Sequence, residues 1–152
     1  MNNKIKILLG IVLVFGLIIV TNPINAIDNE GYIVDVSGIN FKIPNSFVQD
    51  SEPIFDEDNT DIDGNYVHIY GVRFDSEKEG VITISTSTSY GEPFTIEDGL
   101  GGVGVEKTIA GKKGKYYEPE SRFCYVDNGV SIIIKAPNIK TIEYCINATN
   151  SW

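Results

Sequence analysis

The sequence predicts an α+β domain: a twisted, mainly antiparallel sheet built from hairpins, with a C-terminal helix packed on one face. Two observations predict this class. Several short segments after residue 30 alternate apolar and polar residues, which is the pattern of strands that bury one face. The segment at 137–147 instead repeats its apolar residues at the spacing of a helix. Strands that follow one another and are closed by a helix are typical of the α+β class.

The first element is typical of a secretory signal peptide. Lys4 and Lys6 precede an unbroken apolar run at residues 7–20, and a short polar stretch ends at Ala26. Fourteen apolar residues are fewer than the roughly 20 that a membrane span needs, which favours cleavage after Ala26. Retention as an N-terminal anchor is the alternative, because Ile24 stands where a small residue is preferred before the cut.

Residues 27–152 are expected to be exported as a single α+β domain, either secreted or tethered to the membrane by the N-terminal segment. Loss of residues 1–26 removes two lysines and no acids, which changes the formal net charge from −9 to −11. A strongly acidic domain repels nucleic acid and anionic lipid. The predicted partner is therefore an extracellular protein or polymer and not a nucleic acid. Membrane contact is expected only through residues 7–20, if they are retained.

The next elements are two short strands and a long connection. Residues 32–36 and 39–43 alternate apolar and polar side chains, and Ser37-Gly38 between them suits a tight turn. Pro44 is expected to end this pair because it lacks a backbone donor. Residues 45–63 carry seven acidic residues and no lysine or arginine. We expect them to form a long polar connection.

The middle of the chain predicts further strands. Residues 66–74 are apolar on both faces, as in a central strand, and residues 81–88 are rich in β-branched side chains. Thr95 is placed to cap a short helix, which the glycines that follow would end. Up to four more strands are predicted at residues 105–111, 113–118, 122–126 and 130–136.

The last elements are a tight turn and a helix. Asp127-Asn128-Gly129 is a strong signal for a turn between two strands, because Asn and Gly accept positive φ. Pro137 and Asn138 are placed at the start of the closing helix. One face of this helix, expected to cover the sheet, carries Ile139, Ile142, Cys145 and Ile146.

Four segments carry a resemblance to known proteins. They read VSGINFKIPNSF, TIAGKKGKYYE, FCYVDNGVSIIIKA and IKTIEYCI, in that order. The chain resembles small exported proteins of methanogenic archaea and, more distantly, PsbP-like sandwich domains. The resemblance implies an antiparallel sheet that carries helices. The archaeal group has no assigned activity, so the resemblance transfers no functional residue.

The acidic run DEDNTDIDGN, residues 56–65, has the residue types of a calcium loop. Asn59, Asp61 and Asp63 fit the first three ligand positions of such a loop. The last position requires a bidentate glutamate but is occupied by Tyr70. The sequence therefore favours a solvated turn, with these three residues as weak calcium candidates.

Two cysteines and one sequon are candidate sites of covalent modification. Cys124 and Cys145 could form a disulfide in an oxidising compartment, or each could pack as a small apolar residue. Two thiols and the single histidine, His68, are too few for a zinc site, and no metal or other cofactor is predicted. Asn147 begins an acceptor triplet for an N-linked glycan, although an unused sequon is the alternative.

Two further motifs are interpreted as loops. Residues 99–104 spell G-x-G-x-x-G, but the residues that follow have strand character, so no helix is expected to face a phosphate. Lys112, Lys113 and Lys115 are interpreted as a basic turn around Gly111–Gly114, whose charges offset nearby acids. Binding of an anion by these lysines is the alternative.

The sequence predicts a non-enzymatic exported or cell-surface module with a binding role. None of the recognised catalytic motifs occurs in it. The alternative is a small extracellular hydrolase that uses carboxylates, for example from residues 50–63. Such an enzyme needs two carboxylates across a cleft and one pKa raised by burial.

Overall fold

The computed structural model describes residues 30–61 and 63–150. The predicted signal peptide, residues 1–26, lies outside these residues. Within them, no helix combines the length and the apolar character that crossing a membrane would require.

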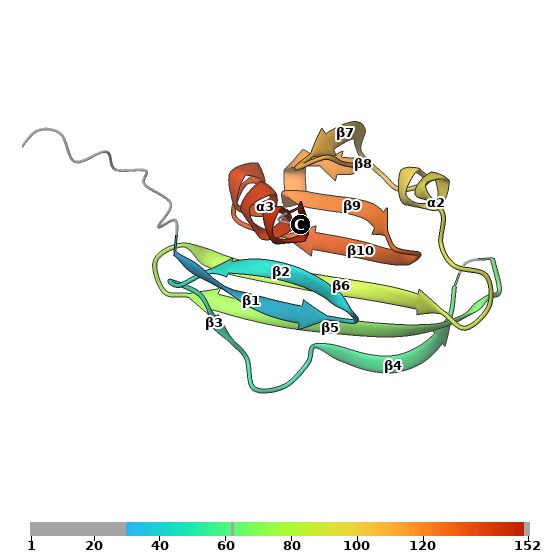
Figure 1. The fold of residues 1–152 in the computed structure, drawn as a ribbon, viewed down its shortest axis with the longest axis horizontal. Coiled ribbons are helices and arrows are strands. Elements are labelled where there is room, and N and C mark those ends of the chain that lie inside the picture. The colour runs from blue at the N-terminus through green and yellow to red at the C-terminus, as the bar shows by residue number, and fades with distance from the viewer. Residues whose placement is uncertain (1–29, 62, 151–152) are drawn as a thin grey trace, which may run out of the picture.

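Two sheets with antiparallel pairing form most of the structure (Figure 1). The smaller sheet pairs β1 (Gly31–Val36) with β2 (Ile39–Pro44). The larger sheet has eight strands in the order β3-β5-β6-β10-β9-β8-β7, and β4 also pairs with β5. Its strands are β3 (Val48–Gln49), β4 (Phe55–Thr60), β5 (Tyr66–Ser76), β6 (Gly80–Ser89), β7 (Val105–Ile109), β8 (Lys112–Tyr117), β9 (Arg122–Asp127) and β10 (Val130–Lys135).

The helices are few and short. α2 spans Ile96–Leu100 and α3 spans Ile139–Ile146, and two 3₁₀ turns, η1 and η2, span Glu118–Glu120 and Asn147–Asn150. Antiparallel strands closed by a C-terminal helix confirm the predicted α+β class.

One hydrophobic core lies between the large sheet, the β1–β2 pair and α3. The β1–β2 pair lies over β5 and β6, and α3 packs against β2 (Figure 1). The core is filled by fully buried side chains from all of these elements, among them Phe41, Phe74, Ile84, Phe123 and Ile142. Because strands alternate their side chains, each of these strands presents its other face outward.

The predicted capping residues begin both helices. The Asn138 side chain accepts a hydrogen bond from the Thr141 backbone N–H over 3.0 Å at the start of α3. Thr95 and Asp98 form a capping box at the start of α2. In α3, Cys145 and Ile146 are buried with Ile142, which is the face that the helical spacing predicts.

Two predicted boundaries are wrong. The polar connection expected at residues 45–63 contains β3 and β4, because both of these segments pair with β5. The basic turn expected at Gly111–Gly114 is instead centred on Ala110 and Gly111, which have positive φ of 48° and 78°. Lys112 already belongs to β8, because a two-residue turn of this kind closes an antiparallel pair without further residues.

Candidate functional site

The candidate site lies on the face of β5 that packs against the core, at the end of the strand that the β1–β2 pair does not cover. Figure 1 shows β5 and β6 extending past the turn between β1 and β2. That turn is fixed by a 2.7 Å hydrogen bond between the hydroxyls of Ser37 and Thr86. Thr86 pairs with Tyr70, and the next row on the same face pairs exposed Thr88 with His68. His68 therefore lies on the core face at the first position that the β1–β2 pair leaves open.

Strand β4 brings two carboxylates to this histidine. Its register places Asp58 opposite His68 and Asp56 opposite Tyr70. Residues two positions apart on a strand share a face, so both carboxylates flank the imidazole. All six residues of β4 are exposed, as suits a charged edge strand that resists pairing with other chains.

The contacts of His68 involve both ring nitrogens. Nδ1 lies 2.9 Å from Oδ1 of Asp58, and Nε2 lies 3.3 Å from Oδ1 of Asp56. The neutral imidazole has a single N–H, so only the protonated ring can donate to both carboxylates. The Tyr90 hydroxyl donates to the same Asp58 oxygen over 2.8 Å. Asp58 is therefore held from two sides.

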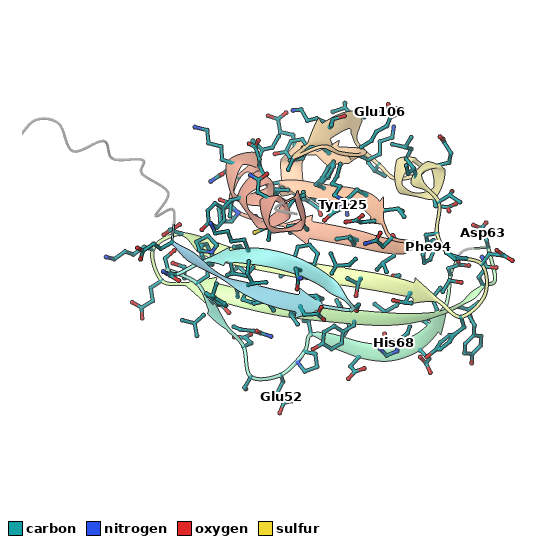
Figure 2. All side chains as sticks on the ribbon, viewed as in Figure 1. Glu52, Asp63, His68, Phe94, Glu106 and Tyr125 are labelled. Atoms are coloured by element: carbon teal, nitrogen blue, oxygen red, sulfur yellow. The ribbon has the colours of Figure 1, made fainter. Side chains whose placement is uncertain are left out.

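Two exposed aromatic rings adjoin the carboxylates. Tyr66 and Tyr90 are 63% and 64% exposed, and their ring centroids lie 6.3 Å apart with a tilt of 50°. Figure 2 shows His68 near β4, at the end of the sheet where Asp63 also lies. We call this surface the acidic aromatic site; it consists of Asp56, Asp58, Tyr66, His68 and Tyr90.

Hydrogen bonding favours the ionised form of Asp58. The hydrogen bond with His68, and after it the bond from Tyr90, lowers the pKa of Asp58. The same contact with Asp58 raises the pKa of Tyr90. Asp58 therefore stays ionised, and Tyr90 stays protonated, over a wider pH range than either side chain would alone.

The three calcium candidates lie at the end of β4 and in the turn between β4 and β5, and they make local hydrogen bonds, Asp63 through its backbone N–H. Asp61 Oδ1 accepts from the backbone N–H groups of Asp63 and Asn65, at 3.0 and 2.8 Å. Its Oδ2 accepts from the Asn65 side chain over 3.0 Å, and this bond is the main cause of the lowered pKa of Asp61. Asn59 Oδ1 accepts from the Thr60 backbone N–H. Among the described residues, no three His, Cys, Asp or Glu side chains are grouped to hold a metal ion.

The two cysteines are free thiols in the structure. Cys145 is buried on α3 within the core. Cys124 is flanked on β9 by Phe123 and Tyr125, which are both fully buried in that core. Because neighbouring strand residues face opposite sides, Cys124 faces away from the side that Cys145 occupies. Because the two thiols lie on opposite sides of β9, they do not form a disulfide in this structure.

The remaining predicted motifs have structural settings. Asn147 is exposed at the end of α3. Lys112 and Lys113 form ion pairs with Asp127 and Glu106, at 2.8 and 2.9 Å, so these lysines offset nearby acids as predicted. The glycine-rich segment 99–104 leads from α2 into the strand β7 and does not open a helix.

The acidic aromatic site was not predicted from the sequence, because the acidic run has the composition of a polar connection. Asp63-Gly64 stands between two segments of strand length, which is a signal for a turn between paired strands. That signal predicts a β4–β5 pair, and such a pair would place an acidic residue of the run opposite His68. It does not predict the contact with Tyr90, which depends on the arrangement of three strands.

No family model, curated protein or solved structure matches this chain. The resemblance to small exported archaeal proteins stays a prediction.

Proposed function

We propose that the protein is an exported or cell-surface binding module whose acidic aromatic site takes a basic partner, such as a lysine- or arginine-rich segment of an extracellular protein or polymer. The observation that carries this proposal is the Asp58 carboxylate, held by Tyr90 and His68 beside two exposed tyrosine rings.

The chemistry of the site favours a cation. Carboxylates form short, charge-assisted hydrogen bonds with ammonium and guanidinium groups. Aromatic faces attract the same cations, with the largest effect where water is excluded. The hydrogen bonds that fix Asp58 reduce the side-chain entropy lost on binding. The formal net charge, −9 for the full chain and −11 without residues 1–26, would also accelerate the approach of a basic partner.

We also propose that the large sheet is twisted and assembled from hairpins, with the C-terminal helix on one face. Support comes from the antiparallel pairing of strands that are consecutive along the chain, such as β5 with β6 and β9 with β10. Such a sheet would present β4 as an accessible edge.

The hydrolase alternative has less support. A general acid in a glycosidase needs a raised pKa. Among the described residues, the carboxyl groups with a shifted pKa all have it lowered, namely Asp58, Asp61, Asp75, Asp98, Glu106 and Glu120. Asp56 and Asp58 also lie on one strand and contact one imidazole, whereas the alternative requires carboxylates on opposite sides of a cleft.

The proposal is tested by titrating the protein with a lysine- and arginine-rich peptide, followed by backbone amide NMR. Binding should shift the amides of β4, of Tyr66 to His68 and of Tyr90. The double variant Asp56→Asn/Asp58→Asn should weaken binding at least about tenfold, because it removes two charged hydrogen-bond acceptors. Tyr66→Ala should weaken it less.

The matched control is the double variant Glu52→Gln/Asp63→Asn. It removes the same charge from two exposed positions that do not belong to the acidic aromatic site. We expect an affinity within about twofold of the native protein, since exposed charges act mainly through screened, long-range attraction. An equal loss in both double variants, or equal binding of an acidic peptide, would contradict a specific site.

A further inference from the structure

A pocket separate from the acidic aromatic site lies where four distant parts of the chain meet. It is a half-open pocket of about 300 Å³, near the lower end of the range for ligand pockets. Most of its exposed lining is polar. The lining comes from β2 and the turn before it, from β8, from the end of β9, and from η2, and consists of Gly38, Ile39, Asn40, Lys112, Asp127, Asn128 and Ala148.

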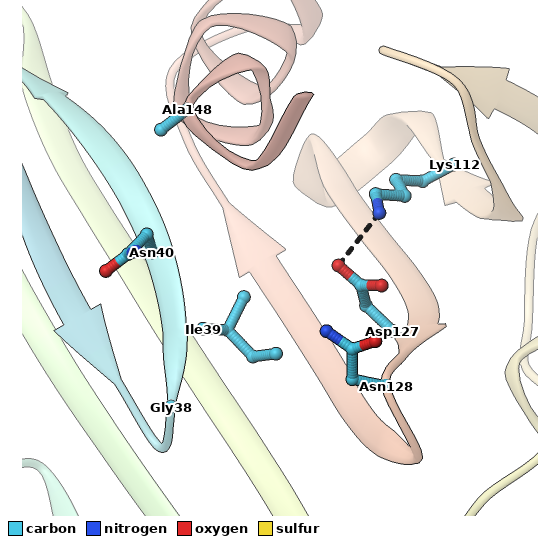
Figure 3. A pocket seen from close by; sticks show the side chains of 7 residues that line it. All are labelled: Gly38, Ile39, Asn40, Lys112, Asp127, Asn128 and Ala148. Carbon is cyan, nitrogen blue, oxygen red and sulfur yellow. Dashed lines mark ion pairs between the residues drawn. The ribbon is translucent and has the colours of Figure 1, made fainter. Parts of the chain in front are cut away.

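The pocket contains an ion pair that is shielded from solvent. Lys112 Nζ lies 2.8 Å from Asp127 Oδ2, and the two side chains are only 21% and 15% exposed (Figure 3). An ammonium group has three donors and a carboxylate has several acceptor positions. Within the described part of the chain, one contact joins these groups, so further donors and acceptors remain for a ligand.

Figure 3 shows how the other lining side chains are directed. The Asn128 side chain lies beside Asp127, and Ile39 points from β2 toward this pair. Asn40 points away from the ion pair. Lys112, Asp127 and Asn128 therefore present the hydrogen-bonding groups, and Ile39 contributes an apolar wall.

We propose that this pocket binds one neutral sugar residue of an extracellular glycan through Lys112, Asp127 and Asn128. Each sugar hydroxyl both donates and accepts, so it can accept from the ammonium group and donate to the carboxylate while the ion pair stays intact. The side-chain amide of Asn128 also supplies a donor and an acceptor. A free anion would face Asp127, and a free cation would face Lys112, so the paired charges select against both.

The proposal is independent of the acidic aromatic site, because the two sites share no residue. The test is an amide NMR titration of the whole exported domain with glucose, galactose, mannose and N-acetylglucosamine, each to about ten millimolar, a range that detects millimolar affinity. At least one sugar should shift the amides of residues 38–40, 112, 127–128 and 148.

Two variants and a matched control accompany the titration. Lys112→Met should weaken sugar binding at least about tenfold, because it removes a charged donor. Lys113→Met is the control, since Lys113 is the next residue on β8 and pairs with Glu106 outside the pocket. It should bind as the native protein does. Asn128→Gly removes the amide but tolerates the positive φ of 49° at this position. It should also weaken binding, and it provides the test if Lys112→Met fails to fold.

Three results would overturn the proposal. The first is that none of the four sugars shifts the pocket amides. The second is that Lys112→Met and Asn128→Gly bind sugar as well as Lys113→Met does. The third is that glycine or acetate shifts the same amides at lower concentration than any sugar, which would assign the pocket to a zwitterion or an anion.

Discussion

The Tyr90 hydroxyl donates to Asp58 Oδ1 over 2.8 Å, although 32 positions separate the two residues in the chain. Asp58 lies on β4 and Tyr90 follows β6, and both of these strands pair with β5. The bond therefore spans the width of β5 and connects the exposed edge strand β4 to the residue that follows β6. The electrostatics of the acidic aromatic site depend on this connection.

The first prediction concerns the ionisation of Asp58 in Tyr90→Phe. Loss of the tyrosine hydroxyl should raise the pKa of Asp58 toward its ordinary value, while the hydrogen bond with His68 keeps it lowered. A carbon-detected NMR titration of the Asp58 carboxyl measures this change. The control is Tyr66→Phe, because Tyr66 contacts the Tyr90 ring and should leave the Asp58 pKa as it is. An unchanged value in Tyr90→Phe would show that the hydroxyl does not bind Asp58 in solution.

The second prediction concerns stability in acid. The pKa of Asp58 is lower in the folded than in the unfolded protein, so its ionised form favours folding. This contribution is complete above the unfolded value of about 3.9 and disappears as the pH falls through the lower folded value. Asp58→Asn should therefore be less stable than the native protein at about pH 6, and the difference should be smaller at about pH 2. Urea unfolding at both pH values measures the difference; a difference that does not change with pH would refute the link.

The third prediction concerns close packing between β8 and β9. A Cβ atom at Gly114 would overlap the carbonyl oxygen of Cys124 and approach the Phe123 ring to 2.9 Å. Gly114→Ala should therefore lower the free energy of unfolding by about 2–4 kcal/mol, because a backbone group has to move. The control is Gly102→Ala, where no atom lies within 4 Å of the new Cβ. Equal stability of the two variants in chemical denaturation would contradict the β8–β9 register.

The fourth prediction concerns the two thiols. Burial raises the pKa of Cys145 to about 12 and also raises that of Cys124. Since the thiolate is the reactive form, both cysteines should react slowly with a thiol reagent in the folded protein, and Cys145 more slowly. Both should react fully in denaturant without a reductant, as counted by mass spectrometry. A requirement for reductant would establish the disulfide that the structure lacks.

The fifth prediction concerns the turn between β4 and β5. Asp61→Ala should open this turn, because it removes the acceptor for the backbone N–H groups of Asp63 and Asn65. Faster amide hydrogen exchange at these two positions measures the opening.

Millimolar Ca²⁺ should leave the melting temperature unchanged, since stabilisation requires a ligand concentration above its Kd. A rise that is lost in Asp61→Asn/Asp63→Asn would make the turn a calcium site.

The amino-acid sequence by itself determined the elements whose signals are local. Alternation of apolar and polar side chains located β1 and β2, because burial of one face requires that period. Apolar and β-branched runs located the strands from β5 to β10 to within a few residues. The start of α3 was predictable from Asn138, since an N-cap acts on backbone groups only three residues away.

Tertiary structure alone decided the features that depend on pairing between distant segments. The segment FDEDNT has few of the residues that favour strands, and it becomes β4 because β5 offers it an edge to pair with. The setting of Asp58 required both that register and the return of the chain to Tyr90. The pocket beside Lys112 requires contact among β2, β8, β9 and η2, and the faces of Cys124 and Cys145 depend on how β9 meets α3. Apart from the turn signal at Asp63-Gly64, which indicates the β4–β5 pair, these relationships are set by packing of the whole sheet and have no local pattern in the sequence.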